Sequence, residues 1–135
     1  MLSVEDRLAI REMLALYGYI VDERQFSRTG EIFTADARYD VTDFGKGVRH
    51  GPEGIVAGWT DPAARHPLAH YAIDVIITED DDGTVRVICK GIGLQADGRA
   101  HGVTYHDVVT RTADGWRIAE RVAIRRHPDR IPEVS

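Results

Sequence analysis

The second half of the chain restricts the fold most strongly, because it contains four strand-like segments joined by short turns. These segments are rich in β-branched and apolar residues, which favour strands. An acidic turn at 79–83 follows the first segment, and Asp97-Gly98 and Asp114-Gly115 follow the next two. An Asp-Gly pair between alternating runs is a strong hairpin signal. We therefore predict an antiparallel meander of the segments 68–78, 84–94, 102–112 and 116–126.

The N-terminal segment 8–22 is predicted to be an amphipathic helix. Ser3 can cap this helix, and Asp6, three residues later, is favoured by the helix dipole. Apolar residues recur at helical spacing, with charged residues on the other side. The apolar side consists of Leu8, Ile10, Met13, Leu14, Tyr17, Ile20 and Val21.

The region between the helix and the meander contains shorter elements. A short helix is predicted within 26–37, and a first strand over 37–43. A glycine-rich loop follows at 45–51. Pro52 is well placed to start another helix over 52–59.

This order of elements predicts an α+β fold, in which helices pack on one face of a mostly antiparallel sheet. The chain has 135 residues and no internal repeat, linker or low-complexity tract. We therefore expect a single domain spanning 1–135. The tail over 127–135 contains two prolines and is expected to be extended.

Composition argues against several classes of function. The net charge is −5 and the basic residues are scattered, whereas nucleic-acid binding needs a concentrated basic surface. No run of ~18 apolar residues suggests a membrane span, and the first residues lack a secretory pattern. We therefore expect a cytoplasmic protein with neither nucleic-acid nor membrane partners.

Metal and cofactor motifs are not evident either. Cys89 is the only cysteine, so an internal disulfide or a cysteine metal cluster is excluded. The pairs His66/His70 and His101/His106 span a loop or a strand rather than one helical face, unlike a zinc motif. We predict no metal ion and no other cofactor.

Four stretches carry a resemblance to a known family: IREMLALYGYIVD, EIFTADARYDV, HPLAHYAIDVIITEDDDGTVRVICKG and VTYHDVVTRTADGWRIAERVAIRR. In this order they resemble the SnoaL-like branch of the NTF2-like superfamily, over nearly the whole chain. The resemblance implies a cone-shaped fold, in which a strongly bent sheet wraps around the first helix and encloses a mostly apolar pocket. Such proteins include scytalone dehydratase-like and bile-acid dehydratase-like enzymes, polyketide cyclases, ketosteroid isomerases and epoxide hydrolases. Membership therefore constrains the fold far more than the reaction.

The resemblance also implies a catalytic group, because Tyr17, Asp22 and His70 match the tyrosine, aspartate and histidine of the dehydratase-like branch. A histidine can remove a proton next to a carbonyl group, and a neighbouring carboxylate orients the ring and stabilises its protonated form. A tyrosine hydroxyl can donate a hydrogen bond to the developing enolate oxygen.

Helix geometry places a condition on this group. Five residues advance ~140° around a helix, so Tyr17 and Asp22 share a face only if the helix ends or loosens near Val21. His66 competes with His70 for the histidine position. The family pattern favours His70, at the start of a strand, and places His66 in the preceding loop.

Tyr39 and Tyr105 are predicted to contact the substrate. The dehydratases carry a further tyrosine in their first strand, where this chain has Val41, and Tyr39 lies two residues earlier on the same face. Alternation places Tyr105 and Asp107 on one face of their strand and His106 on the other. Either face could line the pocket.

Arg125 is the third predicted substrate-binding residue. It matches an arginine that some dehydratase-like members place in the last strand, where it could bind an acidic group on a ligand. Strict alternation from Trp116 puts Arg125 on the opposite face, so an inward Arg125 requires a bulge. Arg126, the next residue, is an equally simple candidate for binding an acidic group on a ligand.

Two functions follow from these features. The first is a cofactor-independent dehydratase or isomerase acting on a hydrophobic cyclic substrate. The alternative is a non-catalytic ligand-binding or assembly module with the same fold. The resemblance also implies a homo-oligomer, a dimer or a trimer, formed through Val103, Tyr105 and Val109 or through the opposite face of the sheet.

Overall fold

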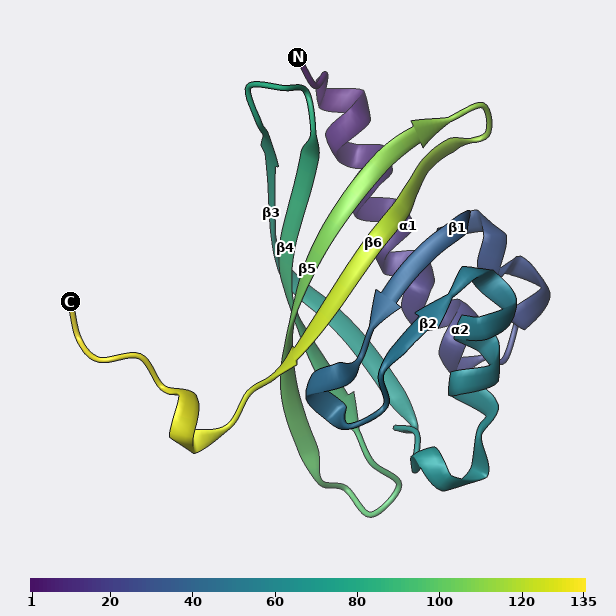
Figure 1. The fold of residues 1–135 in the computed structure, drawn as a ribbon, viewed down its shortest axis with the longest axis vertical. Helices are drawn as coiled ribbons and strands as arrows, with labels where there is room; N and C mark the ends of the chain where they lie inside the picture. Colours follow the sequence, from purple (N-terminus) through teal and green to yellow (C-terminus); the bar gives the residue numbers. More distant parts are fainter.

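Helix α1 is the longest helix in the computed structural model, which describes residues 1–135 (Figure 1). It spans Val4–Asp22 and begins with a capping box. The Ser3 hydroxyl accepts a hydrogen bond from the Asp6 backbone N–H at 3.0 Å, and the Asp6 carboxylate accepts one from the Ser3 N–H at 3.1 Å. The predicted helix and its cap are therefore confirmed.

The sheet has six strands in the order β2-β1-β6-β5-β4-β3. All neighbours are antiparallel except β1 and β6, which run parallel. The last four strands form the predicted meander. The strands are β1 (Phe33–Asp40), β2 (Val48–His50), β3 (Ala69–Glu79), β4 (Val85–Leu94), β5 (Ala100–Thr112) and β6 (Gly115–Arg125).

The region between α1 and the meander departs from prediction in two places. Strand β1 runs from Phe33 to Asp40 rather than over the predicted 37–43. It ends at Asp40 because the Asp40 carboxylate accepts the Thr42 backbone N–H and the chain turns into a 3₁₀ helix. Strand β2 lies within the predicted glycine-rich loop. It was not predicted because three residues are too few to show a periodic pattern. The short helices are α2 (Gly51–Thr60) and the 3₁₀ helices Phe26–Glu31, Thr42–Phe44, Pro62–Ala64 and Pro128–Arg130.

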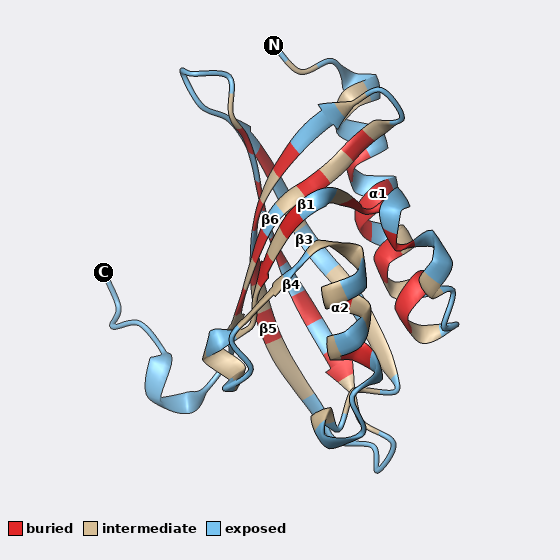
Figure 2. Ribbon diagram, turned by 45° about the vertical axis from the view of Figure 1, so that its right-hand side comes forward, coloured by how far each residue is buried: buried red, intermediate tan, exposed pale blue.

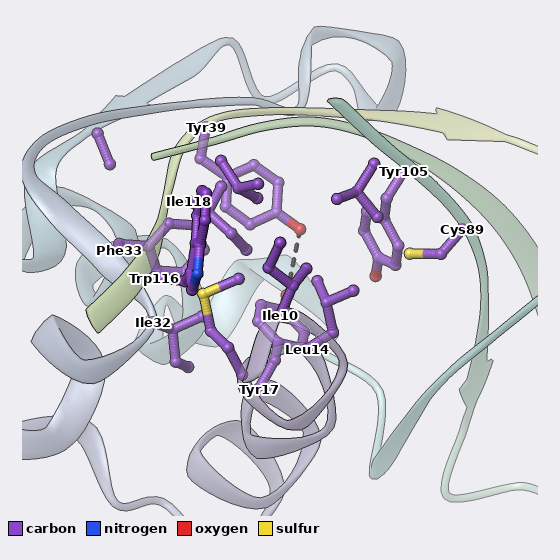
Figure 3. Close-up of a cluster of buried hydrophobic side chains, with 14 of the residues drawn as sticks. Ile10, Leu14, Tyr17, Ile32, Phe33, Tyr39, Cys89, Tyr105, Trp116 and Ile118 are labelled. Atoms are coloured by element: carbon purple, nitrogen blue, oxygen red, sulfur yellow. Dashed lines mark hydrogen bonds between the residues drawn. The ribbon is translucent and has the colours of Figure 1, made fainter. Parts of the chain in front are cut away.

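The hydrophobic core lies between α1 and the concave face of the bent sheet (Figure 2). Ile10, Leu14 and Tyr17 of α1 point towards the sheet, as the close-up in Figure 3 shows. Strand β4 alternates strictly, with Val87 and Cys89 buried on the inner face and the residues between them exposed. Burial of this single apolar face holds the helix inside the curve of the sheet.

A β-bulge interrupts the pairing of β5 and β6. Val108 pairs with Glu120, but Val109 pairs with Ile118, so β6 carries one extra residue. Trp116 and Ile118 point inward before the bulge, and Arg121 and Ala123 are the inward residues after it. The bulge thus reverses the alternation, and it brings Arg125 onto the inner face as the prediction required.

The outer face of β3 and β4 is apolar and uncovered. Tyr71 pairs with Ile92 and Ile76 pairs with Ile88 across the two strands, and the side chains of Tyr71 and Ile76 are 55% and 59% exposed. Val103, Tyr105 and Val109 lie on the inner face instead, so of the two predicted association surfaces only the outer face of the sheet is available.

No helix combines the length and the apolar character needed to cross a membrane.

Candidate functional site

A cavity of about 540 Å³ lies at the end of the sheet where β4 and β6 finish. Helix α2, the β1–β2 loop and the loop before β3 form its other walls. Phe44, Ile55, Trp59 and Val103 supply apolar surface. Small-molecule sites typically occupy about 300–1,000 Å³, so a ring compound fits a cavity of this volume.

Asp22 and His70 form a hydrogen-bonded pair beside this cavity. The Asp22 carboxylate accepts the His70 backbone N–H at 2.9 Å, and its other oxygen lies 2.7 Å from His70 Nδ1. His70 lines the cavity, and its Nε2 atom makes no hydrogen bond within the chain. Because the carboxylate holds both the backbone and the ring of His70, it sets the orientation of the imidazole.

Gly18 allows this pairing. A Cβ atom at Gly18 would lie 2.9 Å from the backbone oxygen of His70, closer than a real Cβ tolerates. The missing side chain therefore lets the start of β3 approach the last turns of α1. Helix α1 ends at Asp22 itself, which leaves the Asp22 carboxylate free to turn towards His70.

Tyr17 and Asp22 serve different partners. The Tyr17 hydroxyl lies 3.1 Å from the Tyr39 hydroxyl, the contact drawn as a dashed line in Figure 3. The Tyr17 ring stands edge-on to the His70 ring, with centroids 6.2 Å apart. Helix α1 does not end before Asp22, so Tyr17 and Asp22 keep the angular separation expected along a helix. Neither of them lines the cavity, and both meet the site through their contacts with other residues.

His66 also lines the cavity, from the loop before β3. Its ring lies against the His70 ring, with centroids 4.6 Å apart and planes 35° apart. Burial, and after it the neighbouring His70, lowers the pKa of His66 to about 4. His66 is therefore neutral at neutral pH. It packs against His70, whereas His70 alone holds the carboxylate.

A buried ion pair lies beneath the tyrosines. Arg121 Nε and Nη2 each donate to the Asp107 carboxylate at 2.8 Å, and both side chains are inaccessible to solvent. The Arg121 guanidinium also lies over the rings of Tyr105 and Tyr17, at 4.1 and 4.7 Å from their centroids. Arg121 Nη1 has no partner. The Arg121 guanidinium therefore helps to fix the positions of the Tyr17 and Tyr105 rings.

The sequence pattern did not predict Arg121, although one signal was available. Alternation had placed Asp107 on the same strand face as Tyr105, and that face is the buried one. A buried carboxylate requires a cation, and Arg121 is its cross-strand neighbour in the β5–β6 hairpin.

Tyr39, Tyr105 and Arg125, predicted to contact the substrate, all line the cavity. Burial raises the pKa of both tyrosines, so each hydroxyl stays protonated and can donate a hydrogen bond. Arg125 Nε lies 3.6 Å from Asp43, and Arg126 lines the cavity as well. No three His, Cys, Asp or Glu side chains are grouped to hold a metal ion.

Comparison with known proteins gives a family match over most of the chain. The profile of the SnoaL-like domain matches residues 2–122. An uncharacterized protein of Mycobacterium tuberculosis is 33% identical over 130 residues, which cover 89% of this chain and 85% of that protein.

Two solved structures from Novosphingobium aromaticivorans share the fold. A proposed aromatic ring hydroxylase is 29% identical, with a TM-score of 0.71 and coverage of 95% of this chain and 94% of that one. An NTF2-like protein with a cystatin-like fold is 25% identical, with a TM-score of 0.77 and coverage of 90% and 82%. The second structure supports the NTF2-like architecture of this chain.

Proposed function

This chain belongs to the SnoaL-like family of NTF2-like proteins, and on that premise we propose that it is a cofactor-independent lyase or isomerase acting on hydrophobic cyclic compounds. The family is one of small-molecule-binding proteins. The observation that carries the proposal is the Asp22–His70 pair, whose histidine borders a cavity large enough for a ring compound.

His70 is the proposed general base. A carboxylate only accepts hydrogen bonds, so Asp22 holds the proton of neutral His70 on Nδ1 and leaves the lone pair on Nε2. Nε2 then takes a proton from the carbon next to a substrate carbonyl, and Asp22 stabilises the imidazolium that forms. In a dehydration, the same proton passes to the departing hydroxyl group, which leaves as water.

The tyrosines are proposed to bind the substrate oxygen. Tyr105 makes no hydrogen bond within the chain, and its hydroxyl remains protonated because burial raises its pKa. Of the other two tyrosines, Tyr39 lines the cavity and Tyr17 does not. When the Tyr17 hydroxyl donates to the Tyr39 oxygen, Tyr39 keeps its own proton for a ligand. A fixed donor of this kind stabilises an enolate oxygen more than the carbonyl from which it forms.

Deuterium exchange tests this proposal without knowledge of the natural substrate. The protein is incubated in D₂O with a panel of mono-, bi- and tricyclic ketones and β-hydroxyketones, and deuterium at the α-carbon is followed by mass spectrometry. We expect exchange with some panel members and a loss of about 10²–10⁴-fold in His70→Gln. His106→Gln, an exposed histidine on the outer face, is the matched control and should exchange like the wild type.

Ligand binding without exchange by any panel member would favour the alternative, a non-catalytic binding or assembly module. Wild-type exchange rates in His70→Gln would reject His70 as the base.

We also propose that two or more copies associate through the outer face of β3 and β4. The cross-strand pairs Tyr71–Ile92 and Ile76–Ile88 form an uncovered apolar strip, and such strips commonly mark interfaces. Light scattering at micromolar concentration should give the mass of a dimer or trimer. Ile76→Lys should shift it towards the monomer, and a monomeric wild type would reject this interface.

A further inference from the structure

The charges around the cavity are unlike those of the rest of the chain. The protein carries a net charge of −5, yet the residues lining the cavity include Lys46, Arg49, Arg65, Arg125 and Arg126 and no aspartate or glutamate. Four of these five cations are exposed, whereas Arg49 is partly buried. Positive charge is therefore concentrated at one place on an acidic protein.

Several arginines elsewhere in this chain pair with a carboxylate, but most of the cavity cations do not. Arg49, Arg65 and Arg126 make no ion pair and no side-chain hydrogen bond, and Lys46 donates only to the Ala64 backbone oxygen, at 3.0 Å. Arg125 has a partner in Asp43, 3.6 Å away. Asp43, however, is shared with Arg130 outside the cavity, at 2.6 Å. Most of the positive charge is thus left without a counterion from the protein.

Arg49 is the inner cation of this group. It extends from β2 against α2, where a Cβ atom at Gly58 would lie 3.1 Å from its Nε. The absence of a side chain at Gly58 lets the guanidinium stem lie against the helix. Arg49 Nε is buried and has no hydrogen-bond partner within the chain. A buried donor without a partner has a free-energy cost that a bound acceptor would remove.

We infer that the ligand is a cyclic carboxylic acid, whose ring occupies the apolar part of the cavity and whose carboxylate binds Arg49. The planar guanidinium matches a carboxylate with two parallel hydrogen bonds, and the cavity contains one such inner cation for one negative charge. The four exposed cations, Lys46, Arg65, Arg125 and Arg126, attract the anion to the cavity. This inference rests on the proposed function, in which a ring compound occupies the same cavity.

Matched pairs of probes test the inference by calorimetry. Each pair consists of an aromatic carboxylate and its neutral carboxamide of the same shape, such as 2-naphthoate and 2-naphthamide, with monocyclic and tricyclic pairs alongside. At pH 7.5 and 20 mM salt, we expect the acid of the best-fitting pair to bind at least tenfold more tightly than its amide. Arg49→Gln should weaken acid binding by about tenfold and leave amide binding within twofold.

Arg86→Gln is the control variant, because it makes the same change in net charge at the far end of β4. It should bind both probes like the wild type. Amides that bind as tightly as acids in every pair, or acids that do not bind at millimolar concentration, would overturn the inference. Naphthyl phosphate binding more than tenfold tighter than naphthoate would also overturn the assignment to a carboxylate.

The two proposals can fail separately. His70→Gln should slow deuterium exchange by about 10²–10⁴-fold and keep the preference for the acid over the amide. Exchange lost in His70→Gln with no preference for acids would leave the catalytic proposal standing and reject the acidic ligand. A preference for acids with exchange unchanged in His70→Gln would reject the catalytic proposal and leave the acidic ligand standing.

Discussion

Replacing Asp22 with asparagine should move a proton across the His70 ring. In the wild type, one carboxylate oxygen accepts the His70 backbone N–H at 2.9 Å and the other lies 2.7 Å from Nδ1. Asparagine has one oxygen and one NH₂ group in the same shape. Its oxygen must face the backbone N–H, because two donors cannot face each other. Its NH₂ group then faces Nδ1, which must become an acceptor.

The consequence is the wrong tautomer for a base. With Nδ1 as acceptor, neutral His70 carries its proton on Nε2, and the cavity side of the ring has no lone pair. The asparagine also lacks the charge that stabilises an imidazolium. We expect proton abstraction to slow by about 10³–10⁴-fold, as in a catalytic triad with this substitution, or about 4–5 kcal/mol in the barrier. The fold should lose only about 1–2 kcal/mol, since both hydrogen bonds survive in neutral form.

Two measurements check this expectation. Deuterium exchange into the ketone panel gives the rate, and ¹⁵N chemical shifts of the His70 ring give the tautomer directly. Asp81→Asn, in the exposed β3–β4 turn, is the matched control and should change neither. The reasoning is refuted if neutral His70 keeps its proton on Nδ1 in the Asp22→Asn variant, or if the exchange rate of this variant stays within tenfold of the wild-type rate.

Three further substitutions give expected changes in the free energy of unfolding, measured by urea denaturation. In Gly91→Ala the new Cβ would lie 2.5 Å from a ring carbon of Tyr105, so overpacking should cost about 1–3 kcal/mol; a neutral result would mean that the ring has room to move. Arg121→Met leaves the Asp107 carboxylate buried and unpaired and should cost about 3–5 kcal/mol, most of it recovered in the double variant R121M/D107L. Burial, with a neighbouring histidine, lowers the pKa of His66 from 6.5 to about 4, so the unfolded chain takes up this proton first. Stability should therefore fall as pH drops from 6.5 to about 4, by roughly 2 kcal/mol after allowing for partial exposure, and His66→Asn should remove that part of the slope.

Elements with local signals could be predicted from the sequence. The capping box of Ser3 and Asp6, the apolar side of α1 and the turns at Asp97-Gly98 and Asp114-Gly115 each depend on residues close in sequence. Strand β2 could not, because its three residues are set by pairing with β1 rather than by their own pattern. The start of β1 was missed for a similar reason, since its first residue, Phe33, pairs with the distant Ile118.

The residues of the candidate site could be named from the sequence, but the contacts between them could not be predicted. Tyr17, Asp22 and His70 could be named from the family pattern, but helix periodicity alone could not bring Asp22 to His70. That contact depends on Gly18, whose missing side chain lets β3 approach the helix. The inward position of Arg125 depends on the β6 bulge, and a bulge is a property of two paired strands. Contacts between distant segments therefore decide what the residue types can do.

The parallel pairing of β1 with β6 bears on the order in which the molecule assembles. Strands β3 to β6 can pair through short hairpins, whereas β1 can join these four strands only through β6, the last of them in chain order. Closing so long a loop is entropically costly, and contacts between distant segments slow folding. We expect pulse-labelled hydrogen exchange to protect β4 and β5 before β1. The cavity needs walls from both halves of the chain, so it forms at the end of folding, and a ligand can bind only to a chain that has completed it.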